Sequence, residues 1–126
     1  MNLHESGENY LETILLLKKQ KGEVRSVDIA NELEYSKPSV SRAVGILRDS
    51  GYITVADNGL IHFTEKGLKR AEGVYERHRI IGQYLMMTLG LDHSLADADA
   101  CRIEHIISKE TFQRIKKYVA DHRDQV

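Results

Sequence analysis

Two short helix-forming segments joined by a tight turn restrict the folds open to this chain of 126 residues more than any other feature. Ser26 is a favourable N-cap for a first helix over residues 27–33, and Ser36 caps a second helix over residues 37–49. Pro38 falls in the first turn of the second helix, where its missing N–H is harmless. The spacing is typical of a helix-turn-helix.

A hairpin signal follows the second helix directly. The strand-like residues 52–55 and 60–63 flank Asp57-Asn58-Gly59, and Asn-Gly is a strong signal for a tight hairpin. Two helices and a hairpin in this order predict a winged helix-turn-helix, which binds double-stranded DNA.

Helical periodicity predicts four more helices. One covers residues 6–21 and ends at Gly22, and three follow the hairpin, opened by Thr64, by a capping box Ser94-Leu95-Ala96-Asp97 and by Ser108. The predicted fold class is mainly α. It consists of a winged helix-turn-helix domain over residues 1–73 and an α-helical domain over residues 74–126.

Composition limits the partners of such a chain. Lys and Arg number 18 against 19 Asp and Glu, a net charge of −1, so any DNA binding must be local. The single cysteine cannot form an intramolecular disulfide, which favours a reducing cytoplasm. The aliphatic run at residues 14–17 is far shorter than the roughly 20 residues that cross a bilayer, so we expect no membrane partner.

The open face near the start of the second helix carries candidate DNA-binding side chains. Lys37, Ser39, Ser41 and Arg42 supply cations and hydroxyls for phosphates and base edges, and the helix N-terminus favours phosphate. Arg42 is the candidate base reader. The acidic tip at residues 57–59 predicts a weak contribution from the wing.

Three metal-ligating side chains recur at helical spacing near the C-terminus. Cys101, Glu104 and His105 lie at i, i+3 and i+4, which places a thiolate, a carboxylate and an imidazole on one helical face. Further donors stand on two other predicted helices: His78, and Asn9 with Glu12. A site for one divalent ion is predicted if these helices converge.

The softness of the donors bears on the identity of the ion. A thiolate and an imidazole beside a carboxylate favour Fe(II), Co(II), Ni(II) or Zn(II) over Mn(II). We therefore expect Fe(II), with Mn(II) as the other candidate. Co(II), Ni(II) or Zn(II) should bind as surrogates in vitro.

Four segments carry a resemblance to a known family: Glu8-Asn9-Tyr10-Leu11-Glu12-Thr13-Ile14, Ser36-Lys37-Pro38-Ser39-Val40-Ser41, Glu76-Arg77-His78-Arg79 and Ala100-Cys101-Arg102-Ile103-Glu104-His105. Over nearly its whole length the chain resembles the diphtheria toxin repressor and manganese transport regulator family, in the short form without an SH3-like domain. The resemblance implies a metal-activated repressor of iron or manganese homeostasis, whose helices after the wing bind metal and form a homodimer.

The resemblance also implies roles for single residues. Metal-ligand positions are occupied by Cys101, Glu104 and His105, and positions that ligate in one branch or the other are occupied by His78 and Glu12. DNA-facing positions are occupied by Ser36, Pro38, Ser39 and Arg42.

Three positions depart from the family pattern. Asn9 stands where the family usually has Met or Asp, so it offers a neutral amide oxygen. Gly82 stands where Glu is common, and Asp97 stands where the iron branch has His. A second ion would have His78 and Asp97, although Asp97 is also expected to act as the N3 residue of its capping box. We expect one firmly held ion per subunit.

Residues 80–89 are apolar on more faces than a monomer of this size can cover. This predicts a homodimer whose two recognition helices read a palindromic operator. An ion held between the first and fifth helices would shift the population towards the arrangement that binds DNA.

Two alternatives follow from the same residues. A winged-helix regulator could sense an organic ligand, independently of metal, in an apolar pocket around Met86 and Met87. A hydrolase could use Cys101 as nucleophile with His105 or His78 as base, but the sequence offers no oxyanion loop and no third orienting residue.

Overall fold

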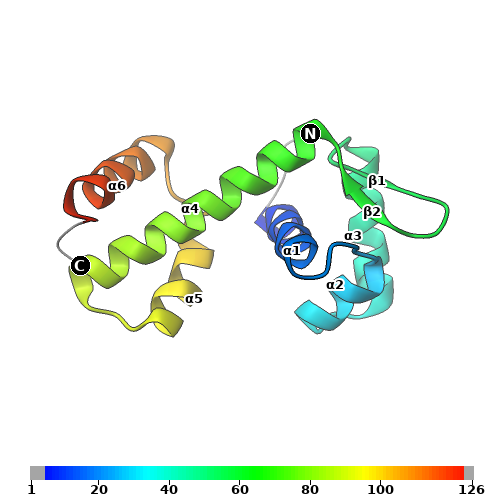
Figure 1. Cartoon of the computed structure of the whole chain (residues 1–126), viewed down its shortest axis with the longest axis horizontal. Helices are drawn as coiled ribbons and strands as arrows, with labels where there is room; N and C mark the ends of the chain where they lie inside the picture. Colours follow the sequence, from blue (N-terminus) through cyan, green and yellow to red (C-terminus); the bar gives the residue numbers. More distant parts are fainter. Residues whose placement is uncertain (1–4, 124–126) are drawn as a thin grey trace. The chain divides into compact units, whose positions relative to one another are not determined.

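Six helices and one antiparallel hairpin make up residues 5–123, the part of the chain that this computed structural model describes (Figure 1). In chain order they are α1 (Glu5–Lys21), α2 (Ser26–Leu33), α3 (Lys37–Asp49), β1 (Ile53–Val55), β2 (Ile61–Phe63), α4 (Glu65–Leu89), α5 (His93–Ile103) and α6 (Lys109–His122). The chain divides into two units within α4, residues 1–72 and residues 73–126. The mainly helical, winged helix-turn-helix fold class is confirmed.

The first unit is built around the apolar faces of α1, α2 and α3. Its largest fully buried side chains come from all three helices, from both strands and from the connection between α1 and α2: Leu11, Ile14, Val24, Ile29, Val40, Leu47, Ile53 and Ile61. In α3 the buried residues Val40, Val44 and Leu47 follow four- and three-residue spacing, as expected for an amphipathic helix. This core fixes α3 with its opposite face open to solvent.

The predicted cap of α3 is confirmed, and that of α2 is shifted by one residue. The Ser36 hydroxyl accepts a hydrogen bond from the Ser39 N–H at 3.3 Å. In α2, Arg25 rather than Ser26 takes the N-cap position, and the Arg25 N–H donates to the Asp28 carboxylate at 2.9 Å. Asp28 satisfies this backbone donor from inside the helix, so the chain enters α2 one residue earlier than the Ser26 cap predicts.

The wing is a two-stranded sheet in which Ile53 pairs with Phe63 and Val55 with Ile61. Beyond the strands the Ala56 N–H donates to the Leu60 carbonyl at 2.9 Å, so the loop has three residues rather than the two of the tightest Asn-Gly hairpin. Gly59 closes it with a φ of 85°. The hairpin lies beside α3 (Figure 1).

Thr64 joins the wing to α4, as predicted. Its hydroxyl donates to the Gly51 carbonyl at 2.6 Å and accepts from the Gly67 N–H at 3.0 Å. Gly67 approaches the Tyr52 carbonyl so closely that a Cβ there would overlap it. The first turn of α4 is therefore locked to the start of the wing.

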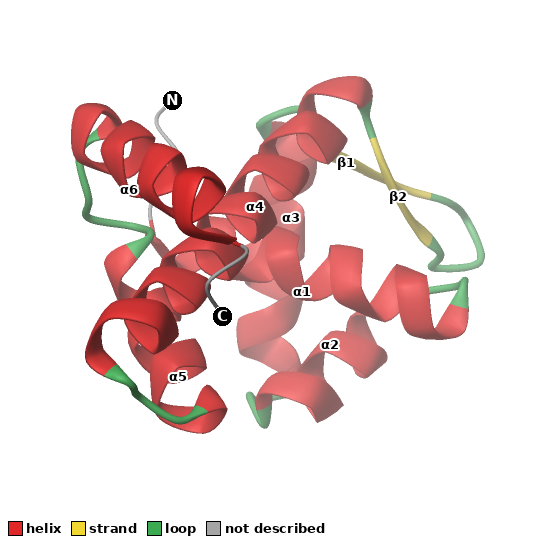
Figure 2. Cartoon of the chain, turned by 60° about the vertical axis from the view of Figure 1, so that its left-hand side comes forward, coloured by secondary structure: helices red, strands yellow, loops and turns green. Residues whose placement is uncertain are grey.

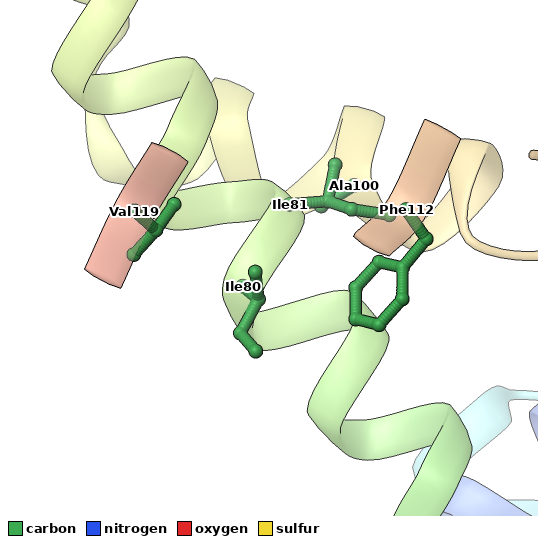
Figure 3. Packing of buried hydrophobic residues seen from close by; sticks show 5 residues of the cluster. All are labelled: Ile80, Ile81, Ala100, Phe112 and Val119. Carbon is green, nitrogen blue, oxygen red and sulfur yellow. The ribbon is translucent and has the colours of Figure 1, made fainter. Parts of the chain in front are cut away.

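In the second unit, α5 and α6 flank the later half of α4 (Figure 1, Figure 2). The core is formed by buried side chains from all three helices, which Figure 3 shows: Ile80, Ile81, Ala100, Phe112 and Val119. Ser108 caps α6 as predicted, accepting from the Thr111 N–H at 3.1 Å. Among the residues described, no helix is both long and apolar enough to cross a membrane.

Both ends of α5 differ from the prediction. Asp92, not Ser94, is the N-cap, and its carboxylate accepts from the Leu95 N–H at 2.9 Å. Asp and Ser are comparable N-caps, and the earlier one prevails, so Asp97 is not the N3 residue of a capping box. The helix ends at Ile103, because the chain must turn before the extended N-cap Ser108.

Replacing Gly67 with Ala should destabilise the protein by about 1–3 kcal/mol or more, because the new methyl group meets a backbone carbonyl that cannot move without distorting the wing. Gly73→Ala in the same helix is the matched control. Its Cβ would meet only the Arg77 guanidinium at 4.0 Å, so it should be neutral or stabilising by about 0.5–1 kcal/mol. Denaturant unfolding followed by circular dichroism measures both, and equal midpoints would contradict the packing described.

Candidate metal centre and nucleic-acid interface

Three predicted ligands meet in the second unit. His78 extends from α4, Cys101 from the last turn of α5, and Glu104 from the residue that caps α5. One potential ligand atom from each lies within 4.8 Å of the others. Donors from α4 and α5 therefore converge, but the imidazole of this group is that of His78, and Glu104 stands just beyond the helix.

His105 is placed differently from the prediction that it shares a helical face with Cys101. It lies in the turn after α5, and its Nε2 atom is 3.3 Å from the Glu104 carboxylate. Both side chains are almost completely inaccessible to solvent. Since a buried carboxylate is costly without a polar partner, this contact helps to keep Glu104 inside.

Asp97 contacts His78 from the middle of α5. The His78 Nε2 atom lies 2.8 Å from a carboxylate oxygen of Asp97 and 3.2 Å from its main-chain carbonyl. Asp97 remains more than half exposed, whereas the His78 ring is mostly buried. Gly82 stands where the family commonly has Glu and has no side chain to bind an ion. It lies against the Ala96 carbonyl and the Ala100 methyl group.

Arg77 is a contributor that the spacing argument missed. Its Nε–H donates to the Glu104 carbonyl at 3.3 Å, across 27 residues of sequence. A guanidinium at the end of a helix satisfies a carbonyl that lacks an intrahelical donor. Only its position directly before His78 could have drawn attention to it.

The donor set suits a first-row divalent ion. Such an ion lies about 2.0–2.3 Å from nitrogen, oxygen and sulfur ligands, so the ligands of one ion stand at most about 4.6 Å apart. The spacing within 4.8 Å in the second unit is near this limit. Imidazole, thiolate and carboxylate together are ligands of Fe(II), Co(II) and Zn(II).

The two predicted donors of α1 lie in the first unit. Glu12 is buried and Asn9 is partly buried. The main-chain carbonyl of Asn9 accepts a hydrogen bond from the Thr13 hydroxyl at 2.9 Å. The neighbouring carboxylate of Glu8 is buried and pairs with Arg70 at 2.8 Å. This pair fastens α1 to the beginning of α4.

The candidate DNA-binding residues share the open face of α3 and its cap. The opposite face of the helix is buried in the core. The six candidate residues are all exposed: Ser36, Lys37, Pro38, Ser39, Ser41 and Arg42. The Ser36 hydroxyl donates to that of Ser39 at 2.9 Å, so the Ser39 hydroxyl hydrogen can still point outwards. The face offers donors to an anionic partner.

The acidic wing tip has a cationic neighbour that the sequence reading missed. Arg25 donates from Nε to the Asn58 carbonyl at 3.2 Å, across 33 residues. The same residue's N–H, together with the Lys21 ammonium, lowers the pKa of the Asp28 carboxyl from its ordinary value. The cluster ties the wing loop to the start of α2.

The pocket invoked for an organic ligand is only partly apolar. Met87 packs against the core of the second unit, while Met86 is more than a third exposed. Met86 borders a cavity of about 400 Å³ whose lining also includes His78, Arg79 and Asp97. The methionines are therefore core filler and cavity rim.

Both units match described domain families. Residues 2–60 match the N-terminal DNA binding domain of iron dependent repressors, and residues 64–124 match the metal binding and dimerisation domain of iron dependent repressors. These descriptions do not support a metal-independent regulator. They agree with a function other than catalysis.

Individual relatives agree with these matches. The chain is 30% identical over 125 residues to MJ0568 of Methanocaldococcus jannaschii, an uncharacterized HTH-type transcriptional regulator, covering 98% of this chain and 100% of the relative. It is 32% identical to the diphtheria toxin repressor of Corynebacterium diphtheriae, covering 95% of this chain and 53% of that protein. The solved structure of the manganese regulator SloR superposes with a TM-score of 0.80 at 26% identity, covering 95% of this chain and 55% of that one.

The chain therefore spans the whole of one relative and about half the length of the diphtheria toxin repressor and of SloR. Its two domain matches follow the order of the two units described above. On these grounds the chain belongs to the diphtheria toxin repressor family of iron- or manganese-dependent transcriptional regulators.

Proposed function

We propose that this protein is a metal-activated, DNA-binding transcriptional repressor that controls the level of iron or manganese. The observation that carries the proposal is the grouping of His78, Cys101 and Glu104 in the unit that matches a metal binding domain. The exposed polar start of α3, in the unit that matches a DNA binding domain, supports the other half of the proposal.

His78, Cys101 and Glu104 would hold the ion, and His105 stays a proposed ligand on the family resemblance. When bound, the ion supplies positive charge that neutralises the thiolate and the carboxylate. The thiolate favours Fe(II) over Mn(II) as the ion used. Glu12 and Asn9 are proposed as further ligands on the family resemblance of their segment alone.

Adding Fe(II) or Co(II) should strengthen binding to duplexes selected from a random library, and a chelator should weaken it. Loss of an outer-shell partner lowers metal affinity about 10- to 100-fold. Cys101→Ala should lower Co(II) affinity by more than this, because a direct ligand and its charge are lost. Calorimetry and the thiolate-to-cobalt absorption band measure this.

Arg102→Ala is the control for Cys101→Ala, since Arg102 is the next residue and is exposed. It should keep both the band and the affinity. Equal DNA binding with Co(II) and with chelator would refute metal activation.

Arg42 is proposed to read a base, and Lys37 to contact phosphate. Arg42→Ala should weaken binding to the selected duplex by about 1–3 kcal/mol, while Lys37→Ala should weaken all duplexes alike. Arg48→Ala is the control, because this exposed arginine at the other end of α3 pairs with Asp49. Fluorescence anisotropy on selected and scrambled duplexes distinguishes the roles, and equal losses on both for Arg42→Ala would remove it as a reader.

A homodimer is proposed from the dimerisation family match and from exposed apolar side chains late in α4, Met86 and Leu89. A dimer would place two α3 helices about 34 Å or a multiple apart, on a palindromic operator. Light scattering at micromolar concentration should give about twice the chain mass of 14.4 kDa. Leu89→Glu should shift it towards the monomer, whereas Val27→Glu, at an exposed apolar residue of α2, should not. A monomeric wild type would contradict this proposal.

A further inference from the structure

We infer that Asp97 is a positioning residue that fixes which nitrogen of His78 is available to a metal ion. The inference rests on the proposed function, because it assigns the outer partner of a proposed ligand. It differs from the expectation that Asp97 itself binds an ion. The contact lies wholly within the second unit, where His78 is on α4 and Asp97 on α5.

The hydrogen-bond chemistry of this contact determines where the proton lies. Nε2 of His78 faces two oxygens of Asp97, a carboxylate oxygen at 2.8 Å and the main-chain carbonyl oxygen at 3.2 Å. A carboxylate and a carbonyl only accept hydrogen bonds, so the ring nitrogen between them must donate. An imidazole binds a metal ion only in its neutral form, which has one N–H, so in that form the lone pair of His78 lies on Nδ1.

The ligand atom follows from that tautomer. His78 offers one ring nitrogen to the group with Cys101 and Glu104, and Asp97 engages Nε2. Nδ1 is therefore the atom through which His78 binds a divalent ion. A carboxylate on the other ring nitrogen fixes the orientation of the ring and makes the ligating nitrogen more basic.

The exposure of the two side chains fits the division of roles. The His78 side chain is 15% exposed and the Asp97 side chain 58% exposed, so the carboxylate holds the ring from the solvent side. Asp97 can take this position because α5 begins at His93 under the Asp92 cap, which frees Asp97 from a capping role.

The first measurement uses the metal-free protein. Long-range ¹⁵N–¹H correlation of the histidine rings should show His78 protonated on Nε2, with a downfield N–H proton that exchanges slowly. In Asp97→Ala this proton should move upfield and exchange faster. At a pH high enough for a neutral ring, protonation of wild-type His78 on Nδ1 instead of Nε2 would overturn the inference, whatever the protein does with metal.

The second measurement is Co(II) binding by calorimetry. Asp97→Ala should lower the affinity about 10- to 100-fold at unchanged stoichiometry, the usual effect of losing an outer-shell partner. Asp97→Asn keeps an acceptor oxygen without the charge and should lie between Asp97→Ala and wild type. Asp99→Ala on the same helix removes the same charge and should bind like wild type.

The outcomes separate this inference from the function on which it rests. Equal affinity of wild type and Asp97→Ala would overturn the inference and leave the proposed function in place. Loss of one bound ion per chain, with the remaining affinity unchanged, would mean that Asp97 is a ligand and would also overturn it. A wild type that binds no Co(II) would overturn both. Equal denaturation midpoints for Asp97→Ala and Asp99→Ala show that an affinity loss is not a folding defect.

Discussion

The candidate metal centre depends on the close packing of α5 against α4. Gly82 on α4 has no side chain, and a Cβ there would lie 3.8 Å from the Ala100 methyl group and 4.0 Å from the Ala96 carbonyl. Ala96 and Ala100 are themselves buried, so small residues meet on both helices. Because α5 approaches α4 at this contact, Cys101, the residue after Ala100, is carried to His78. Gly82, which stands where the family commonly has Glu, therefore allows the two helices to pack closely.

Most of the secondary structure could be predicted because capping signals are local. Ser36, Thr64 and Ser108 cap as expected, since each hydroxyl reaches an N–H three residues ahead whatever the rest of the chain does. The start of α5 could not be settled this way, because Asp92 and Ser94 are both good caps two residues apart. The end of α5 at Ile103 was also not predicted. Helical spacing of apolar residues does not indicate where the chain turns before the next N-cap, Ser108.

The candidate metal donors could be named from the sequence, whereas the contacts that support them could not. Residue type marked His78, Cys101 and Glu104 as possible ligands, but helical spacing grouped Cys101 and Glu104 with His105 rather than with His78. The contacts that hold them join residues 19 and 27 apart in sequence, from Asp97 to His78 and from Arg77 to the Glu104 carbonyl. Such pairs depend on how helices pack, which no local pattern specifies. For the same reason a one-helix argument misplaced His105.

The candidate DNA-binding face must attract phosphates through nearby cations, because the net charge of the chain is close to zero. With a net charge of −1 the chain has no long-range field for DNA, so attraction must come from cations within a Debye length of about 8 Å of the phosphates. Lys37, Arg42 and the N-terminus of α3 lie on the open helical face and are the cations and partial charge proposed to supply this attraction. The wing loop carries Asp57, but Arg25 contacts the same loop and sets a positive charge beside it. The wing loop therefore repels a phosphate backbone less than its own sequence indicates, because Arg25, just before α2, places a positive charge beside it.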